Sequence, residues 1–184
     1  FEIFARYIAP NAVDATLTLV GDGPDQDSFK EDARRLGVAD RVFFPGEIAL
    51  SRVVDYYRHA DLFLYTSRSE TYGQVVSEAQ YCGLPVVALE DDMGVSGQIT
   101  SGEDGVLIPN GPSEGHADWR FGGEVVGLLH HTTMRLTMSA QARKNARLRC
   151  DSDRCIQRYY TAFKDARQHC ARTWGKGQRY SQLA

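Results

Sequence analysis

Short apolar segments alternate with helical segments along most of this chain, and this alternation constrains the fold more than any other feature. Segments of this kind, apolar and rich in β-branched or aromatic residues, are typical of strands that are buried on both faces of a parallel sheet. The sequence therefore predicts an α/β fold with a doubly wound parallel sheet. The five expected strands are Thr16–Val20, Arg41–Phe44, Leu62–Tyr65, Pro85–Leu89 and Val106–Ile108.

Helical patterns lie between these strands, at Gln26–Leu36, Leu50–His59 and Tyr72–Tyr81. The first is followed by Gly37 and the third by Gly83, and glycine readily adopts the left-handed conformation that ends helices. The connections are short, as is usual in a doubly wound fold.

The C-terminal third of the chain has a different pattern. Residues 110–123 are rich in Gly, Pro and polar side chains, so a surface loop is expected there. From Glu124 onward the sequence predicts helices, the last from Asp153 to about Trp174, followed by a frayed end. We expect residues 1–184 to form a single domain, with its C-terminal helices within residues 124–174.

Composition excludes several classes of protein. A hydrophobic share of 42% and a charged share of 24% are ordinary for a globular domain, and no apolar run approaches the roughly 20 residues of a membrane span. The first residues do not have the pattern of a signal peptide. The four cysteines are scattered, without C-x-x-C pairs or a His cluster, so neither a metal site nor a disulfide framework is expected.

Charge is distributed unevenly along the chain. Residues 1–140 carry 10 Lys or Arg and 21 Asp or Glu, whereas residues 141–184 carry 11 and 3. A basic helical segment can contact anionic lipid, although a solvated helix face is the commoner explanation. Nucleic-acid binding is not expected.

The most informative stretch runs from Thr66 to Ala88. A strand ends at Tyr65, a short polar loop follows, and a helix is expected to begin near Tyr72. In doubly wound folds the loops at the carboxyl ends of strands line the ligand crevice. Free N–H groups at a helix start favour anions such as a diphosphate. Position alone therefore nominates Ser67–Gln74 as a binding loop.

Two carboxylates, Glu70 and Glu78, lie eight residues apart in this stretch. Carboxylates accept hydrogen bonds from sugar hydroxyls, and two helical turns separate side chains by about 11 Å. The pair could thus hold both ends of a nucleotide sugar. Each residue alone could equally be an ordinary charged residue on a solvated helix.

These residues resemble the Glu-x7-Glu motif of GT-B glycosyltransferases, and the chain is most similar to the large group 1 family, also called family 4. Matching segments follow in the family's order over about residues 15–110; they are Leu19–Pro24, Arg41–Gly46, Ala60–Ser67, Ala79–Val87 and Gly102–Pro109. The resemblance implies a Rossmann-like domain, the C-terminal, donor-binding half of a retaining enzyme that uses a UDP-, GDP- or ADP-sugar and no cofactor.

The resemblance also implies roles for individual residues. Glu78 would bind the ribose hydroxyls, and Glu70 would contact the transferred sugar in a positioning and charge-stabilising role at the catalytic centre, without nucleophilic attack. The remaining expected donor-binding residues are Gly21 in the first turn, Pro45, Gly46 and Glu47 beside the base, and Ser67, Thr71, Tyr72, Gly73 and Gln74 near sugar and diphosphate.

The sequence departs from the family's pattern in three ways. The opening strand and the loop with an Arg and a Lys that neutralise the diphosphate are not evident before Thr16, where residues 1–9 resemble the helix that follows that strand. We therefore expect Thr16–Val20 and Leu62–Tyr65 to flank an unfilled position in the sheet. We also expect the acceptor-binding N-terminal domain of the family to lie outside these residues. Finally, Gln98 takes the place of the usual acidic residue in the loop 94–99.

Other functions fit less well. Gly21-x-Gly23 does not have the third glycine of the dinucleotide-binding fingerprint, so NAD or FAD binding is not expected. A nucleotide-sugar epimerase of the same architecture would not have this Glu-x7-Glu setting. The alternative that stays open is a non-catalytic nucleotide-binding or regulatory module. For the enzyme we expect a cytoplasmic location, with peripheral contact at the inner face of the membrane through the basic segment.

Overall fold

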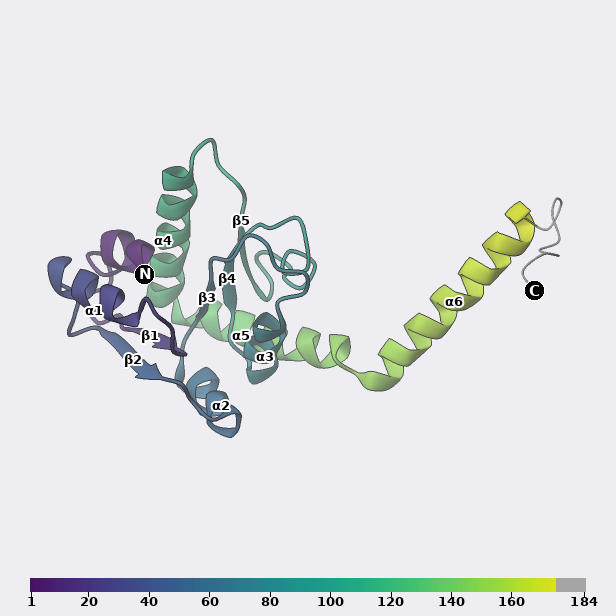
Figure 1. Ribbon diagram of the computed structural model, residues 1–184, viewed down its shortest axis with the longest axis horizontal. Helices are drawn as coiled ribbons and strands as arrows, with labels where there is room; N and C mark the ends of the chain where they lie inside the picture. Colours follow the sequence, from purple (N-terminus) through teal and green to yellow (C-terminus); the bar gives the residue numbers. More distant parts are fainter. Residues whose placement is uncertain (175–184) are drawn as a thin grey trace. The chain divides into compact units, whose positions relative to one another are not determined.

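The structure, a computed structural model, describes residues 1–174 and divides the chain into two compact units, residues 1–146 and residues 147 onward. The second unit contains α6, Ser152–Trp174, and α5 runs from the first unit into it. α5 comprises Thr132–Arg149. The elements that lie wholly in the first unit (Figure 1) are η1 Phe4–Ile8, β1 Leu17–Val20, α1 Gln26–Arg35, β2 Val42–Gly46, α2 Leu50–His59, β3 Phe63–Tyr65, α3 Gln74–Cys82, β4 Val86–Leu89, β5 Gly105–Ile108 and α4 Glu114–His130.

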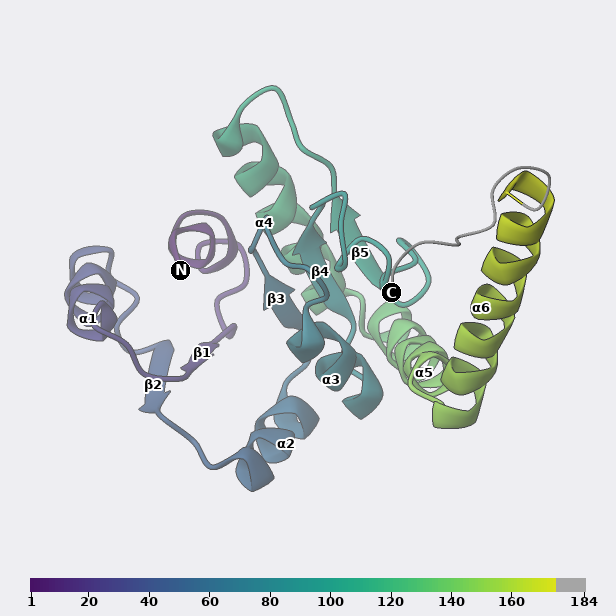
Figure 2. The same cartoon turned by 45° about the vertical axis from the view of Figure 1, so that its right-hand side comes forward.

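The strands form two parallel sheets, and this arrangement confirms the predicted α/β fold. β1 pairs with β2 in one sheet, and the other has the order β3-β4-β5. All five predicted strands are present within two residues of their expected bounds. Among the described residues β1 and β3 are not paired with each other and belong to separate sheets (Figure 2), so the expected unfilled position between them stays a prediction.

The prediction of a surface loop over residues 110–123 was wrong, because α4 begins at Glu114. The side chain of Ser113 accepts a hydrogen bond from the His116 amide and caps the helix start. A buried stripe then follows at helical spacing, formed by Ala117, Phe121, Val125 and Leu128.

Glycine inside α4 has a packing role. A Cβ at Gly122 would lie 2.4 Å from the Cβ of Tyr7, so glycine lets η1 and α4 approach closely (Figures 1 and 2). One of the glycines that suggested a loop is thus part of a helix–helix contact.

Two apolar clusters cover opposite faces of the three-stranded sheet. Val87 and Leu89 of β4 pack with η1 and α4, whereas Val86 and Ala88 pack with α3 and the loop that follows β4. A strand buried on both faces explains why β4 is apolar throughout. α3 therefore packs on one buried face of this three-stranded sheet.

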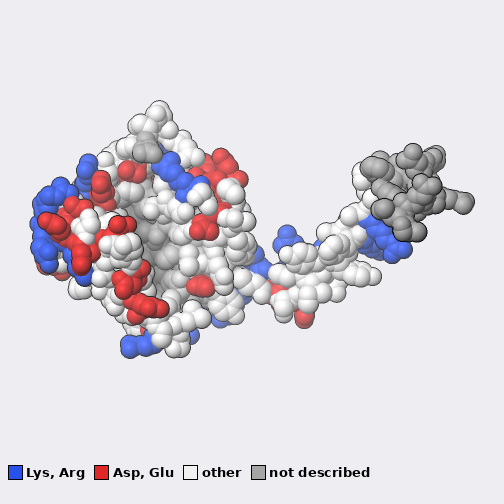
Figure 3. All heavy atoms as spheres, in the orientation of Figure 1, with Lys and Arg blue, Asp and Glu red and all other residues white. Residues whose placement is uncertain are grey.

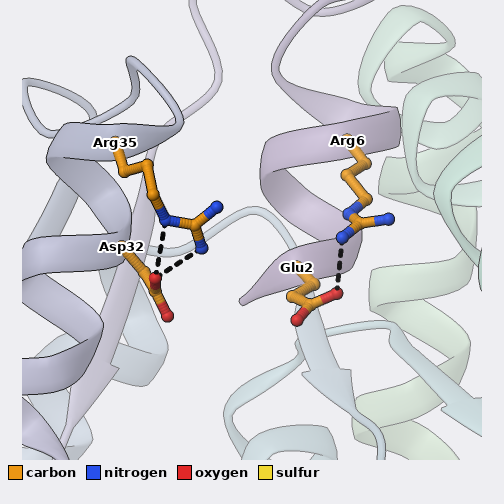
Figure 4. A network of polar contacts seen from close by, with 4 residues as sticks. All are labelled: Glu2, Arg6, Asp32 and Arg35. Carbon is orange, nitrogen blue, oxygen red and sulfur yellow. Dashed lines mark hydrogen bonds and ion pairs between the residues drawn. The ribbon is translucent and has the colours of Figure 1, made fainter.

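Ion pairs between described residues are mostly local and exposed. Glu2 pairs with Arg6 within the N-terminal helical turn at 3.3 Å, and Asp32 pairs with Arg35 on α1 at 2.5 Å (Figure 4). Such pairs stabilise a fold only slightly. Acidic and basic side chains both appear on the face of the first unit in Figure 3, which includes these helices.

Candidate donor-binding site

Three loops at the carboxyl ends of β3, β4 and β5 are connected by side chains. Arg68, after β3, donates to Oδ1 of Asn110 at 3.2 Å, and Asn110 donates to the carbonyl of Glu90, after β4, at 3.4 Å. Because the three strands are parallel, these loops meet at one edge of the sheet. The predicted binding loop therefore lies where ligands bind in doubly wound folds.

Gly73 sets the direction of α3. It is the N-cap residue with φ of +73°, a left-handed conformation, and the helix begins at Gln74 rather than at Tyr72 as predicted. A Cβ at Gly73 would also lie 2.8 Å from Cγ2 of Val95. The amides at the start of α3 lie at the positive end of the helix dipole. This end of α3 is suited to bind an anion.

Glu70 lies in the binding loop and is half-buried. The hydroxyl of Tyr65, at the end of β3, lies beside both Ser67 and Glu70. Burial raises the pKa of Tyr65, and the Glu70 carboxylate adds to this effect. The phenol thus stays protonated beside the carboxylate.

Glu78 lies about one turn into α3, which begins at Gln74, and is held from α2. The hydroxyl of Tyr57 donates to Oε2 of Glu78 at 3.2 Å. Burial raises the pKa of Tyr57, and so does the neighbouring carboxylate. Tyr57 itself is fixed by edge-to-face packing on Phe63 of β3. One carboxylate oxygen is therefore engaged, which leaves the other for a ligand.

The loop after β4 is folded around a buried carboxylate that the sequence analysis did not single out. The side chain of Asp91 accepts hydrogen bonds from the amides of Met93, Val95 and Ser96 and from the Ser96 hydroxyl. Burial alone would raise the pKa of Asp91, but these hydrogen bonds outweigh burial and lower it. The signal in the sequence was an Asp two residues after a fully apolar strand.

This loop packs directly under the binding loop. A Cβ at Gly94 would lie 2.3 Å from the carbonyl oxygen of Thr71 and 2.5 Å from Cα of Tyr72. Gln98, which is 4% exposed, reaches the same backbone from below. The loop after β4 and the binding loop thus pack directly against each other.

The residues expected beside the base are found at the ends of β1 and β2. Gly21 and Gly46 form an isolated bridge, in which the Gly21 amide donates to the Gly46 carbonyl at 3.0 Å. Pro45 is half-buried and Glu47 is exposed. The structure therefore brings Gly21, Pro45, Gly46 and Glu47 together.

The remaining predicted site residues differ in exposure. Thr71, Tyr72 and Gln74 are exposed, and Ser67 is half-buried. Among the described residues no group of three or more His, Cys, Asp or Glu side chains could hold a metal ion. An open depression at the turn between α4 and α5 includes none of the predicted site residues.

Known proteins are similar to this chain in sequence and in fold. The model of the family "Glycosyl transferases group 1" matches residues 2–120. N-acetyl-alpha-D-glucosaminyl L-malate synthase of Bacillus anthracis is 30% identical over 164 residues, which are 89% of this chain and 40% of that protein. A D-inositol 3-phosphate glycosyltransferase of Rhodococcus erythropolis is 36% identical over 120 residues, 65% of this chain and 26% of that protein.

Among solved structures, Anabaena Alr3699/HepE in complex with UDP-glucose has a TM-score of 0.73 at 26% identity, covering 89% of this chain and 44% of that one. The chain thus spans less than half the length of the relatives that it matches.

Proposed function

The chain belongs to the group 1 glycosyl transferases, and on this basis we propose that it is the donor-binding half of a retaining glycosyltransferase. Its ligand would be a nucleoside-diphosphate sugar, and a UDP-sugar is favoured because the similar Anabaena protein was crystallised with UDP-glucose. An acceptor-binding domain would complete the enzyme.

One observation carries this proposal: two carboxylates flank the start of α3, and each lies beside a tyrosine hydroxyl. Tyr65 contacts Glu70 at the loop, and Tyr57 contacts Glu78 on the helix. Between them lie the helix-start amides at Gly73 and Gln74. Carboxylates suit sugar and ribose hydroxyls, and amides suit the diphosphate that connects them. The order carboxylate, amides, carboxylate therefore matches sugar, diphosphate and ribose.

The experiment separates the two carboxylates in the full-length protein. Glu78→Gln should weaken binding of UDP about ten- to a hundredfold in calorimetry, because a charged acceptor of the ribose hydroxyls is lost. Glu31→Gln, an exposed change on α1, is the matched control and should leave the affinity unchanged. Unaltered UDP affinity in Glu78→Gln would remove this residue from the site.

Glu70→Gln should act differently. It should lower the release of UDP from UDP-glucose under turnover and leave the affinity for UDP nearly intact, since Glu70 would contact the sugar. Equal losses of affinity and turnover would contradict this division of roles. Intact binding without turnover in the wild-type protein with any acceptor would instead favour the non-catalytic nucleotide-binding module.

The names of the relatives support small-molecule and lipid acceptors. They include synthases or transferases for L-malate and inositol 3-phosphate, and an alpha-monoglucosyldiacylglycerol synthase of Streptococcus pneumoniae that is 43% identical over 72 residues, 39% of this chain and 16% of that protein. A lipid acceptor would place the enzyme at the cytoplasmic face of a membrane.

Peripheral membrane contact through α6 is part of this proposal. No helix among the described residues could cross a bilayer. Ile156, Tyr160 and Phe163 are 61%, 69% and 73% exposed on α6, and the exposed cation Arg167 follows at helical spacing on the same face. Aromatic residues with Arg suit an anionic lipid surface. Salt-sensitive binding of full-length protein to phosphatidylserine vesicles would support this contact, and no binding at low salt would refute it.

A further inference from the structure

The carboxamide of Gln98 makes a set of contacts that the donor-binding roles do not yet use. Its Nε2 donates to the carbonyls of Tyr72 and Gly94, the latter at 3.2 Å, and approaches the carbonyl of Gly73 at 3.5 Å. Its Oε1 accepts a hydrogen bond from the Ser77 hydroxyl at 2.5 Å. Carbonyl oxygens can only accept, so the NH2 group has to face them, which fixes the orientation of the amide.

These contacts determine where the amides before α3 point. No peptide bond is cis, and in a trans peptide the C=O and the following N–H point in opposite directions. With the carbonyl of Tyr72 directed at Gln98 in the interior, the N–H of Gly73 is directed away from it. The same holds for the carbonyl of Gly73 and the N–H of Gln74. Gly73 also accepts from the Val76 amide at 2.9 Å, which supports this orientation.

We propose that Gln98 is the positioning residue that aims the Gly73 and Gln74 amides at the diphosphate of the donor. This inference rests on the proposed function and adds to it a role for the loop after β4. Gln98 touches no ligand and acts through the two peptide planes. Donors that are oriented before the ligand binds need no reorganisation when the diphosphate arrives.

Several contacts of the loop after β4 hold the side chain of Gln98 in place. Asp91 folds residues 92–96 through its bonds to their amides, and Val95 packs against Gly73. Gln98 is 4% exposed, and the Ser77 hydroxyl that holds its Oε1 is itself 7% exposed on α3. Water therefore has little access to replace the carboxamide at the two carbonyls.

In this chain the surrounding carbonyls favour a neutral donor at a position where the family usually has an acidic residue. The three carbonyl oxygens around Nε2 carry partial negative charge, so a carboxylate there would be repelled. A protonated carboxyl group could still donate one hydrogen bond to a carbonyl. Burial among carbonyls raises the pKa of a carboxyl group, so its protonation falls within an accessible pH range.

The test uses Gln98→Glu in the full-length protein, with whichever of UDP, GDP or ADP binds the wild type. At pH 8 the variant should bind the nucleoside diphosphate about ten- to a hundredfold more weakly than the wild type. At pH 6 the factor by which the variant binds more weakly than the wild type should be several-fold smaller, since protonation of the introduced carboxyl group restores a hydrogen-bond donor. The loss should be smaller for the nucleoside monophosphate, which has one phosphate fewer to meet the amides.

A control separates positioning from folding. Gln141→Glu alters another side chain of the first unit that donates a hydrogen bond, to Asn145 at 3.2 Å on α5, and should leave both affinities unchanged. The readout is the change with pH in the ratio of variant to wild-type affinity, so a modest loss of stability in Gln98→Glu that is the same at both pH values does not imitate it.

Each outcome decides the inference. Equal losses for diphosphate and monophosphate, or a ratio to wild type that does not change between pH 8 and pH 6, would overturn the role of Gln98 and leave donor binding intact. Failure of the wild type to bind UDP, GDP or ADP would instead overturn the proposed function, and this inference with it.

Discussion

The two sheets of the first unit differ in how firmly their loops are held. β4 is buried along its whole length, and the loop after it is folded around Asp91 and packed under the binding loop. β1 has alternating burial, and a Cβ on Gly21 or Gly23 in the turn after it would meet nothing within 4 Å.

This difference indicates a division of labour in the proposed site. The three-stranded sheet holds the charged and dipolar groups of the proposed site, namely the two glutamates and the helix-start amides. Such groups act best when they are held in place before the ligand arrives. The two-stranded sheet offers an open surface near the base, where shape and apolar contact suffice. The following predictions test this comparison, from the largest expected effect to the smallest.

The largest effect is expected in the core of the three-stranded sheet. Ile108→Ala in β5, a side chain 1% exposed, should lower the free energy of unfolding by about 2–5 kcal/mol. Val20→Ala at the end of β1, which is 42% exposed, should cost much less. Urea denaturation of both variants measures the difference. Comparable losses would show that the two sheets are equally well packed.

The Asp91 carboxylate should contribute stability that depends on pH. Its pKa is lower in the folded protein than the usual value of about 3.9, so its contribution is complete above pH 4 and is lost as the pH falls through the lowered pKa. Asp91→Asn should cost about 1.5–3 kcal/mol at pH 7, and less at pH 3.

Asp22→Asn is the matched control for this change. Asp22 is exposed in the turn after β1, where its carboxylate accepts a bond from the Gly23 amide at 2.7 Å. It should alter stability by less than about 0.5 kcal/mol. A penalty for Asp91→Asn that stays constant from pH 7 to pH 3 would contradict the stated role of the charge.

The contact between the two loops predicts a further asymmetry. Gly94→Ala places a methyl group against the Thr71 carbonyl, so the loops must separate at a cost of about 1–3 kcal/mol. Gly94→Ala should weaken nucleotide binding as well as lower stability. Gly23→Ala meets no neighbouring atom and should change neither. Equal behaviour of the two variants in thermal unfolding would refute the close packing of the loops.

The smallest effect tests the contact between α2, which follows the two-stranded sheet, and α3, which packs on the three-stranded sheet. α2 follows β2, and its Tyr57 reaches Glu78 on α3. Tyr57→Phe removes the hydroxyl and should weaken nucleotide binding about three- to tenfold, with little change in stability. Tyr56→Phe on the same helix is the control. An unchanged affinity in Tyr57→Phe would show that Glu78 needs no support from α2.

Much of the fold could be predicted because its signals are local. Apolar runs such as residues 85–89 and the glycine stop at Gly83 depend on neighbours in the sequence alone. The error over residues 110–123 has the opposite cause. Glycines inside α4 have poor intrinsic helix propensity, and the helix is stabilised by contacts with η1 that no local pattern reveals.

The candidate site divides in the same way. Glu70, Glu78 and Gly73 are recognisable from their spacing, because the chemistry needs these residue types on one loop and one helix. Asp91 was not recognised, and Gln98 was noted only as a departure from a familiar pattern. Their partners lie within the same loop or more than twenty residues away, in contacts formed when the loop after β4 packs under the binding loop.

The sequence by itself determined the order of strands and helices, the family and the two carboxylates, because periodicity and motif spacing are properties of short segments. Tertiary structure alone decided that Tyr57 reaches Glu78 and that Gln98 faces the carbonyls of Tyr72 and Gly73. The physical reason is that the orientation of a buried polar group depends on which donors and acceptors surround it. That surrounding is complete only when distant segments pack together.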